Sequence, residues 1–552
     1  MNTFTRISYL FVFLAGTLLT QASERPNIIM LLTDDQRYDT LGCMGNDQVK
    51  TPHIDKLGER GVIFQSHYTN TPICLGSRAS TMTGMYEYTN GCNFSHGNLS
   101  RELWEEVSYP VMLRKNGYFT GFIGKFGFPV DASNYHEYES LPIDSFDRWY
   151  GWTGQGYFET SKNKYMEKFA DEYPHVTMAT AVAACEFIDD AKKQDKPFCL
   201  SLSFKASHKP FSPDPAYDEV YKDTVWKKRA NYDEAGARKL PPQAKLGRQY
   251  LTMTDFKPEK YQDSMRKYNQ LIYGVDQAVG RITAKLEASG LSKNTVIIYA
   301  TDNGYSCGSH GFSGKVLPYE GPSRGPMIIM DPRSNQAGKR SNGVSGNVDI
   351  HPTICDLAGI SIPKKINGKS LVPVLKNSET RVREAMPVFN FWGSAATHEM
   401  TIITEKFKYI YWYHEGDGMV AAEELYDRQK DAVEMNNLVS NPEMAPQLEK
   451  MRQLFDSQVQ HLRDNAMADR NYSEYGKLLD RNLAWDEKKN YVQKSFAKGY
   501  EQMRDIAENG QTKKPKKEKK SKEKKEKSAD AKERVRKPKS ERKPKKAKNE
   551  EV

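Results

Sequence analysis

The sequence predicts an α/β fold: a large, mostly parallel sheet sandwiched by helices, with a smaller C-terminal subdomain of an antiparallel sheet and a helix. Two observations predict it. Short apolar runs alternate with helical patterns through the first two thirds of the chain, and this alternation is typical of parallel strands covered on both faces. After about Ser378 the runs become short and alternate apolar with polar residues, which indicates half-buried strands.

The chain begins with the three parts of a secretory signal peptide. Arg6 precedes the apolar run from Tyr9 to Leu19, and Thr20-Gln21-Ala22 offers a small-residue cleavage site. The apolar run is too short to span a bilayer, and no later stretch is long and apolar enough. We therefore expect residues 1–22 to be a signal peptide and the protein to be exported, periplasmic or secreted, with no membrane span. A buried or anchoring N-terminal helix is the alternative.

Residues 23–378 carry the pattern of the large domain. One helix is especially clear, because its apolar residues share one face from Tyr268 to Leu286 and it stops at Gly290. The runs that we expect to be buried strands are Asn27–Thr33, Phe119–Ile123, Pro197–Phe204, Thr295–Ala300 and Pro326–Met330.

The predicted C-terminal subdomain covers residues 379–465. Thr401–Ile403 and Tyr409–Tyr413 alternate as strands do, Glu424-Leu425-Tyr426-Asp427 follows, and a helix is expected from about Pro446 to Leu462. Residues 466–510 are polar and are expected to form a helical extension.

A basic tail, residues 511–552, explains the net charge of +10. It holds 20 Lys and Arg against 8 Asp and Glu, so it carries +12 and leaves −2 for the rest of the chain. Its few apolar residues predict disorder. A basic tail can bind nucleic acid, but export argues against a nucleic-acid partner. Contact with an anionic polymer or cell surface, or no specific role, remain open.

The seven cysteines include no CxxC pair, which excludes the usual zinc and thioredoxin spacings. Apart from Cys74 they are spread through expected core segments, so we expect mostly buried free thiols. Cys74 is different, because it opens the stretch Cys74-Leu75-Gly76-Ser77-Arg78. A cysteine followed by an arginine, with carboxylates far away in the chain, fits a nucleophile that acts on an anionic group beside a hard cation.

Polar groups follow four of the predicted strands. They are Asp34 and Asp35, Lys125, His208, and Asp302 with Asn303. A single Asp after a strand is more often a helix cap than a ligand, and a lone His is more often a surface residue. Four such strand ends together predict a site, because open α/β sheets bind ligands at the carboxyl ends of their strands.

The residue types at these strand ends define the chemistry. Three carboxylates and an amide, from Asp34, Asp35, Asp302 and Asn303, are oxygen ligands that suit Ca²⁺ or Mg²⁺, whereas a two-zinc site would use histidines. The cationic and donor groups Arg78, Lys125, His208 and Lys315 would hold a tetrahedral oxyanion.

At these positions the sequence resembles the type I, formylglycine-dependent sulfatases of the alkaline phosphatase superfamily, from Arg25 to about Leu438. The matching stretches occur in the family's order and make the resemblance specific. They are Asn27–Gln36, Thr51–Leu57, Cys74–Gly84 (CLGSRASTMTG), Gly117–Lys125, Thr301–Gly304, Ser309–Lys315 (SHGFSGK), Glu320–Pro326 (EGPSRGP), Asp349–Gly359 (DIHPTICDLAG) and Glu424–Asp427.

The resemblance implies a fold of the alkaline phosphatase type and a role for each site residue. A maturation enzyme would oxidise Cys74 to formylglycine, whose hydrated gem-diol attacks sulfur, and the aldehyde re-forms as sulfate leaves. Asp34, Asp35, Asp302 and Asn303, with the modified Cys74, would hold Ca²⁺. Arg78 would position the formylglycine, Lys125 and Lys315 would bind sulfate oxygens, and His208 would bind sulfate and protonate the leaving alcohol.

Two residues depart from the family pattern. Gly76 stands where Pro or Ala is usual, which puts the conversion of Cys74 in question because glycine changes chain stiffness. Gly127 stands where the family's Lys-x-His has its histidine. Asp302, or a histidine from elsewhere such as His310, is a candidate for the missing task.

Three functions from different classes remain open. The first is an exported sulfatase that hydrolyses sulfate esters, with a sulfated carbohydrate as the substrate. The second is a phosphate or phosphonate ester hydrolase on the same scaffold, and the third is a non-catalytic binder of sulfated polysaccharide. The aromatic stretch Tyr135–Tyr173, with Trp149 and Trp152, either stacks on sugar rings or packs a layer of loops.

Overall fold

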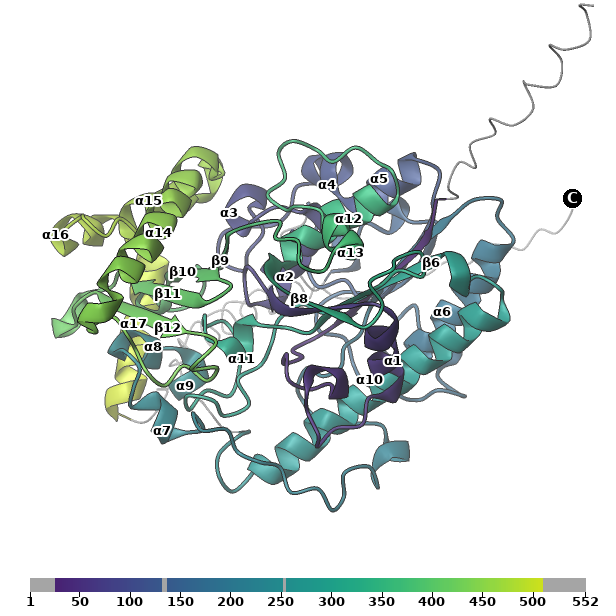
Figure 1. The fold of residues 1–552 in the computed structure, drawn as a ribbon, viewed down its shortest axis with the longest axis horizontal. Coiled ribbons are helices and arrows are strands. Elements are labelled where there is room, and N and C mark those ends of the chain that lie inside the picture. Colours follow the sequence, from purple (N-terminus) through teal and green to yellow (C-terminus); the bar gives the residue numbers. More distant parts are fainter. Residues whose placement is uncertain (1–24, 132–136, 252–254, 510–552) are drawn as a thin grey trace, which may run out of the picture. The chain divides into compact units, whose positions relative to one another are not determined.

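The computed structural model describes residues 25–131, 137–251 and 255–509 (Figure 1). The predicted signal peptide, residues 1–22, and the predicted tail, residues 511–552, lie outside the described residues. The chain divides into two units, Met1–Arg504 and Asp505–Val552. Of the second unit only residues 505–509 are described, as the end of helix α17 (Lys494–Asn509).

A large eight-stranded sheet forms the centre of this unit, in the order β4-β3-β5-β1-β6-β7-β2-β8. All neighbouring strands are parallel except β7, which is antiparallel to both β6 and β2. The fold class predicted from the sequence is confirmed. The strands are β1 (Asn27–Thr33), β2 (Val62–Tyr68), β3 (Phe119–Lys125), β4 (Arg148–Trp152), β5 (Phe198–Ser203), β6 (Thr295–Thr301), β7 (Met327–Met330) and β8 (Lys339–Gly346).

Strand β1 shows why a continuous apolar run predicts a strand in this sheet. Its successive side chains point to opposite faces of the sheet, so Ile29 and Leu31 enter one core and Ile28 and Met30 enter the other. Helices cover both faces (Figure 1). On one face lie α1 (Pro52–Arg60), α6 (Val176–Lys192) and α10 (Tyr261–Ala288); on the other lie α2 (Cys74–Thr83), α4 (Arg101–Val107), α5 (Tyr109–Lys115), α12 (Ile350–Leu357) and α13 (Val372–Lys376).

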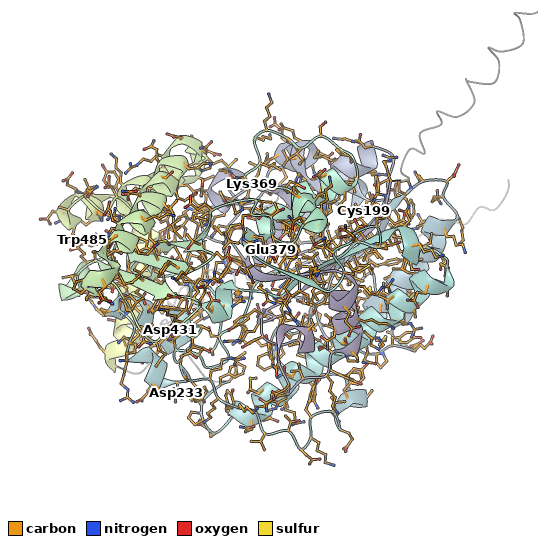
Figure 2. All side chains as sticks on the ribbon, in the orientation of Figure 1. Cys199, Asp233, Lys369, Glu379, Asp431 and Trp485 are labelled. Atoms are coloured by element: carbon orange, nitrogen blue, oxygen red, sulfur yellow. The ribbon has the colours of Figure 1, made fainter. Side chains whose placement is uncertain are left out.

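The two tryptophans of the aromatic stretch pack among other side chains, whereas its Tyr157 is 55% exposed. Its strand β4 is the edge strand beside β3. Trp152 is only 1% exposed, and Trp149 stacks on Phe122 with ring centroids 4.9 Å apart. Side chains fill the space between the sheet and the helices (Figure 2). Cys199, labelled there, is buried in β5. All seven cysteines are free thiols and five are buried, as expected.

A second, four-stranded antiparallel sheet follows, in the order β12-β11-β10-β9. Helix α14 (Ala445–Asn465) packs on it, with Phe455 against Tyr409 and Tyr411. The predicted sheet-plus-helix subdomain is therefore present, while its boundaries at residues 378 and 465 stay predictions. Its strands are β9 (Ala385–Asn390), β10 (Glu399–Thr404), β11 (Phe407–Trp412) and β12 (Ala422–Asp427).

Short helices complete the described chain. They are α3 (Glu87–Asn90), α7 (Glu234–Ala237), α8 (Pro242–Lys245), α9 (Arg248–Leu251), α11 (Glu320–Ser323), α15 (Tyr475–Leu478) and α16 (Trp485–Lys488). None of the helices in the described residues is both long enough and apolar enough to cross a bilayer.

Candidate active site

The predicted strand ends meet at one edge of the large sheet. Asp34 and Asp35 follow β1, Lys125 ends β3, and Asp302 with Asn303 follows β6. These strands are parallel and adjacent or nearly so in the sheet order, so their carboxyl ends deliver these side chains to the same place.

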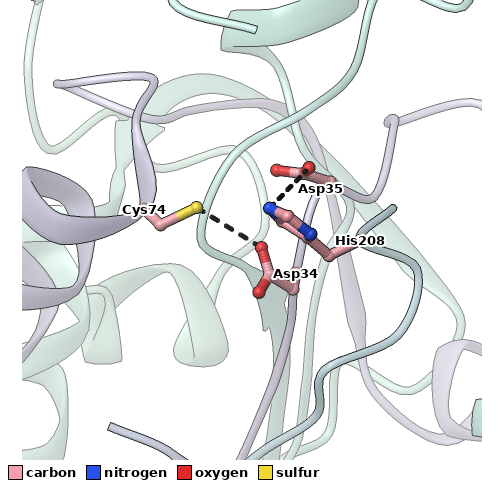
Figure 3. A group of neighbouring side chains, drawn as sticks. All are labelled: Asp34, Asp35, Cys74 and His208. Atoms are coloured by element: carbon pink, nitrogen blue, oxygen red, sulfur yellow. Dashed lines mark hydrogen bonds and ion pairs between the residues drawn. The ribbon is translucent and has the colours of Figure 1, made fainter. Parts of the chain in front are cut away.

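Cys74 and His208 complete this cluster (Figure 3). Cys74 is the first residue of α2, and its Sγ lies 3.5 Å from Oδ1 of Asp34. His208 Nε2 lies 3.7 Å from Oδ2 of Asp35. One potential ligand atom from each of these four residues lies within 4.8 Å of the others. The first residue of a helix also stands at the positive end of the helix dipole, which favours a bound anion.

Two lysines neutralise the acidic pair. Lys125 Nζ lies 2.5 Å from Oδ2 of Asp34. Lys315 Nζ contacts Oδ1 of Asp35 and lies 2.6 Å from Cys74 Sγ. Burial alone would raise the pKa of Asp34, but the charges of Lys125, His208, Arg78 and Lys315 hold that pKa well below its ordinary value. One cation therefore contacts Cys74 directly, and a second holds the carboxylate beside it.

Arg78 lies beneath the cluster and is 1% exposed. Its Nε donates to Oδ2 of Asp302 at 2.8 Å, and its Nη1 donates to the Lys125 carbonyl and to Ser203 Oγ. A guanidinium that is engaged in this way fixes the ends of three strands relative to one another.

Asn303 lies beside Asp35, and both carboxylate oxygens of Asp302 accept hydrogen bonds, Oδ1 from the Asp35 N–H at 3.1 Å and Oδ2 from Arg78. Asn303 Nδ2 donates to Oδ1 of Asp35 at 2.7 Å, while the buried Oδ1 of Asn303 has no hydrogen-bond partner among the described residues. Burial, followed by the charge of Asp34, raises the pKa of Asp302 to about 6. A buried carbonyl oxygen without a donor beside three carboxylates is the arrangement that a hard cation such as Ca²⁺ satisfies.

The unmodified Cys74 thiol is a weak nucleophile in this setting. Burial, with a further contribution from Asp34, raises its pKa to about 12. It is therefore a neutral thiol at pH 7, and a soft sulfur atom is a poor ligand for a hard cation.

His208 lies at the rim of the cluster, where its side chain is 15% exposed. Its Nδ1 lies 2.5 Å from the Lys209 carbonyl, which leaves Nε2 facing Asp35. Burial, with the nearby lysines Lys315 and Lys125, pushes the pKa of His208 well below its ordinary value against the pull of Asp34.

His310 does not join the cluster. Its Nε2 pairs with Asn231 Nδ2 at 3.0 Å and lies 3.8 Å from Glu434, and its ring packs on Tyr319. These contacts hold it away from Cys74, so the structure gives no support to His310 as the replacement for the histidine missing at Gly127.

Gly127 is required by the way Arg78 packs. Its φ of +88° favours glycine, and a Cβ at this position would lie 2.3 Å from Cδ of Arg78. A glycine is favoured at position 76 for a comparable reason, because a Cβ there would lie 2.8 Å from Cγ2 of Thr71. Both departures from the family pattern thus fit their immediate surroundings.

Three further residues around the site were missed from the sequence. Gln155 Oε1 accepts a hydrogen bond from Lys125 at 2.7 Å, and the Gln155 carbonyl accepts one from Lys205 Nζ at 3.0 Å. Asn347 Nδ2 donates to Ser77 Oγ at 2.9 Å, behind Cys74. Lys205 directly follows a predicted strand, so the rule that found the other residues applies to it as well. Gln155 carried no signal in the sequence.

A cavity of about 320 Å³ opens over the cluster. Asp35, His208 and Lys315 line its base, and Tyr305 and Trp392 contribute aromatic walls. Its size lies within the range of about 300–1,000 Å³ that is usual for small-molecule sites.

Comparison with known proteins places this geometry in context. The family model described as sulfatase matches residues 26–360, and a model of the C-terminal part of N-sulphoglucosamine sulphohydrolase matches residues 308–461. The N-acetylglucosamine-6-O-sulfatase of Bacteroides thetaiotaomicron is 26% identical over 512 residues, an alignment that covers 81% of this chain and 88% of that protein.

Two solved structures are also similar. One protein, in complex with its substrate D-glucosamine-2-N,6-O-disulfate, has a TM-score of 0.66 and 26% identity, over 80% of this chain and 99% of its own. The phosphonate monoester hydrolase of Agrobacterium radiobacter has a TM-score of 0.68 at 22% identity, over 79% of this chain and 96% of its own, and so shares the fold.

Proposed function

The chain belongs to the sulfatase family and is a sulfuric ester hydrolase; we propose that its substrate is a sulfated carbohydrate and that its nucleophile is a formylglycine made from Cys74. The observation that carries the proposal is the place of Cys74, at the start of α2, with Lys315 Nζ 2.6 Å away and Asp34 beside it. The relatives that act on sulfated glucosamine support the choice of substrate class.

The chain's own cations hold the sulfate group. Lys315 contacts Cys74 Sγ and Lys125 holds the neighbouring Asp34, so each can turn an ammonium proton from its carboxylate partner to a sulfate oxygen. Such fixed charges stabilise the negative charge that shifts between oxygens as the S–O bond breaks. Arg78 is a positioning residue here, because its Nε and Nη1 are engaged by Asp302, Lys125 and Ser203. Its Nη2 has no hydrogen-bond partner among the described residues and lies 3.5 Å from Oδ2 of Asp34.

A calcium ion fits the oxygen atoms of Asp34, Asp35, Asp302 and Asn303, together with an oxygen in place of the Cys74 sulfur. When bound, the ion supplies positive charge that lowers the pKa of the nucleophilic hydroxyl of the hydrated formylglycine. The orphaned Oδ1 of Asn303 supports this assignment.

His208 is proposed as the acid that protonates the leaving alcohol. Its Nε2 faces the cluster, and its pKa is depressed by burial and by the neighbouring lysines. A bound sulfate ester brings negative charge next to the imidazole, and an opposite charge at this range raises a histidine pKa. The proton would therefore be held at Nε2 when the substrate is present and given to the alcohol oxygen as it leaves.

Export and maturation complete the proposal. Residues 1–22 have the pattern of a signal peptide, and a formylglycine-generating enzyme would act on Cys74 as a partner of the extended chain. Both rest on sequence pattern, and the first falls outside the described residues.

A matched substrate panel tests the function. Wild type and Cys74→Ala are compared on sulfate, phosphate and phosphonate esters of the same alcohol, with a sulfated glucosamine included. We expect sulfate esters to be hydrolysed best, and Cys74→Ala to lose that turnover.

Two other outcomes correspond to the other hypotheses. A preference for phosphonate or phosphate esters would favour the second function, which the fold shared with a phosphonate hydrolase keeps open. Binding of sulfated polysaccharide without turnover of any ester would identify a non-catalytic binder.

A further inference from the structure

We propose that a second cavity, continuous with the active-site cavity, binds the sugar unit next to the one that carries the sulfate, so that the substrate is an oligosaccharide. This inference rests on the proposed function, because it concerns the sugar unit that is bonded to the one that carries the sulfate.

The two cavities share four lining residues, namely Arg248, Gln249, Val316 and Trp392. The second cavity has a volume of about 370 Å³, which lies within the usual range for small-molecule sites. Gln249 connects the second cavity to the loop that carries Lys315. A Cβ on Gly314, the residue before Lys315, would lie 2.7 Å from Cγ of Gln249. A substrate whose sulfate lies against Lys315, which lines the active-site cavity, therefore has its next unit directed along this wall.

Helix α17 forms the far wall of the second cavity through Phe496, Gly499, Gln502 and Met503. Phe496 anchors the helix, because its ring packs against two histidines. The ring centroids are 4.5 Å apart for His398 and 5.4 Å apart for His96. Both family models end at or before residue 461. The wall is thus built by a segment outside the region that defines the family, as expected of a feature that sets the specificity of this chain.

The chemistry of the wall favours a carbohydrate. Trp392 presents an aromatic surface of the kind that packs on the C–H face of a sugar ring, while Ser95, Ser495 and Gln502 offer hydroxyl and amide groups. Among the described residues that line this cavity, Arg248 is charged and none is a carboxylate. A sugar unit with its own sulfate or carboxylate is therefore accepted at this position.

Gly499 allows a graded test. A Cβ at this position would make ordinary contacts, 3.5 Å from the Gly393 carbonyl oxygen and 3.8 Å from Ser394 Cα. Gly499→Ala is therefore the small-side-chain control that keeps the cavity open, and Gly499→Met extends a longer side chain toward it. Trp392→Ala removes the aromatic wall without adding bulk, which guards against a misfolded Gly499→Met.

The measurement is the ratio of kcat/KM for a sulfated disaccharide to kcat/KM for the monosaccharide with the same sulfated unit. We expect the ratio to fall about tenfold in Gly499→Met and in Trp392→Ala, which corresponds to a binding loss near 1.4 kcal/mol. It should stay within about twofold of wild type in Gly499→Ala. Equal ratios in wild type and all three variants would overturn the proposal.

Two controls separate this inference from the proposed function. A matched series of alkyl sulfates of increasing length is assayed in parallel, and an effect of Gly499→Met on long alkyl chains but not on the disaccharide would overturn the carbohydrate assignment. If wild type hydrolyses no sulfate ester, the proposed function fails. Calorimetric binding of the sulfated disaccharide then decides the inference, which requires weaker binding to Gly499→Met than to Gly499→Ala.

Discussion

At the scale of single residues, the two glycines beside Cys74 are fixed by close neighbours. Gly127 adopts a left-handed φ directly against the Arg78 side chain, and Gly76 faces Thr71 and Glu87. The space that a histidine at position 127 would need is thus already filled by the arginine that ties Asp302 to the end of β3. These positions differ from the family pattern for a steric reason, which leaves Arg78 in place.

Gly127→Ala should damage both the fold and the site. The left-handed φ costs about 1–2 kcal/mol for an alanine, and the clash with Arg78 adds about 1–3 kcal/mol of overpacking. Gly45→Ala is the matched control, because Gly45 has a φ of +93° with nothing within 4 Å of an added Cβ. Denaturant unfolding and kcat/KM are measured for both. A Gly127→Ala protein as stable and active as Gly45→Ala would show that Arg78 does not depend on this glycine.

Glu87 makes the stability of the region around Gly76 depend on pH. Burial raises the pKa of Glu87 to about 7, so between about pH 4.5 and 7 the folded state holds a proton that the unfolded state has released. Stability from this group is complete below about pH 4.5 and is lost as the pH rises through 7. A shift of this size corresponds to about 3 kcal/mol.

Glu87→Gln should remove this loss. We expect the free energy of unfolding to fall by up to about 3 kcal/mol more in wild type than in Glu87→Gln between pH 4.5 and 8. Urea unfolding at a series of pH values measures the difference, with the exposed Glu102→Gln as the control. Parallel pH profiles for wild type and Glu87→Gln would refute the assignment.

At the scale of elements, a buried lysine joins the small sheet to the segment that contains α11. Lys408, on β11, is fully buried, and its Nζ lies 2.6 Å from Glu434, 2.8 Å from Glu320 and 2.9 Å from the Pro318 carbonyl. Removing one partner of a buried ion pair leaves the other charge uncompensated, which costs far more than losing an exposed pair.

Lys408→Met should therefore cost about 3–5 kcal/mol of stability. Lys450→Met is the matched control, because Lys450 pairs with Glu384 at 2.8 Å but both side chains are more than half exposed; its cost should stay below about 1 kcal/mol. Chemical denaturation compares the two variants. Equal stabilities of Lys408→Met and Lys450→Met would mean that Lys408 does not join the small sheet to the segment that contains α11.

The strands also show what sequence could and could not predict. Strands β1, β3, β5 and β6 were found because each is apolar and buried on both faces, and the site followed from their ends. Strand β8 was missed because it reads KRSNGVSG, and β2 because it contains Gln65, Ser66 and His67. The two ring nitrogens of His67 form hydrogen bonds with Ser345 and Asn347, which lie 278 and 280 residues away in the chain. Gln155 likewise reaches Lys125 only through the tertiary fold.

At the scale of the whole molecule, the sequence combines a near-neutral segment, residues 1–510, with a strongly basic segment, residues 511–552. The near-neutral segment concentrates buried charge at one sheet edge, where three carboxylates meet Arg78, Lys125 and Lys315. A cation that enters this cluster binds the folded chain and not the unfolded one, so it should stabilise the molecule as a whole.

Calcium should raise the Tm of chelator-treated protein. At a calcium concentration 100 times its Kd, the expected gain is about 2.7 kcal/mol. Differential scanning calorimetry measures the shift, and Asn303→Ala, which lacks the orphaned amide oxygen, should show a smaller one. Elemental analysis that finds two zinc ions per chain, or a Tm that calcium leaves unchanged, would contradict a calcium site.

Mass spectrometry of the peptide that contains Cys74 is the most direct test of whether Cys74 becomes the nucleophile. The peptide is taken from active protein made in its native host. We expect an aldehyde at position 74, because a neutral buried thiol between Lys315 and Asp34 suits neither the cation nor the attack on sulfur. An unmodified thiol throughout protein that hydrolyses sulfate esters would contradict it.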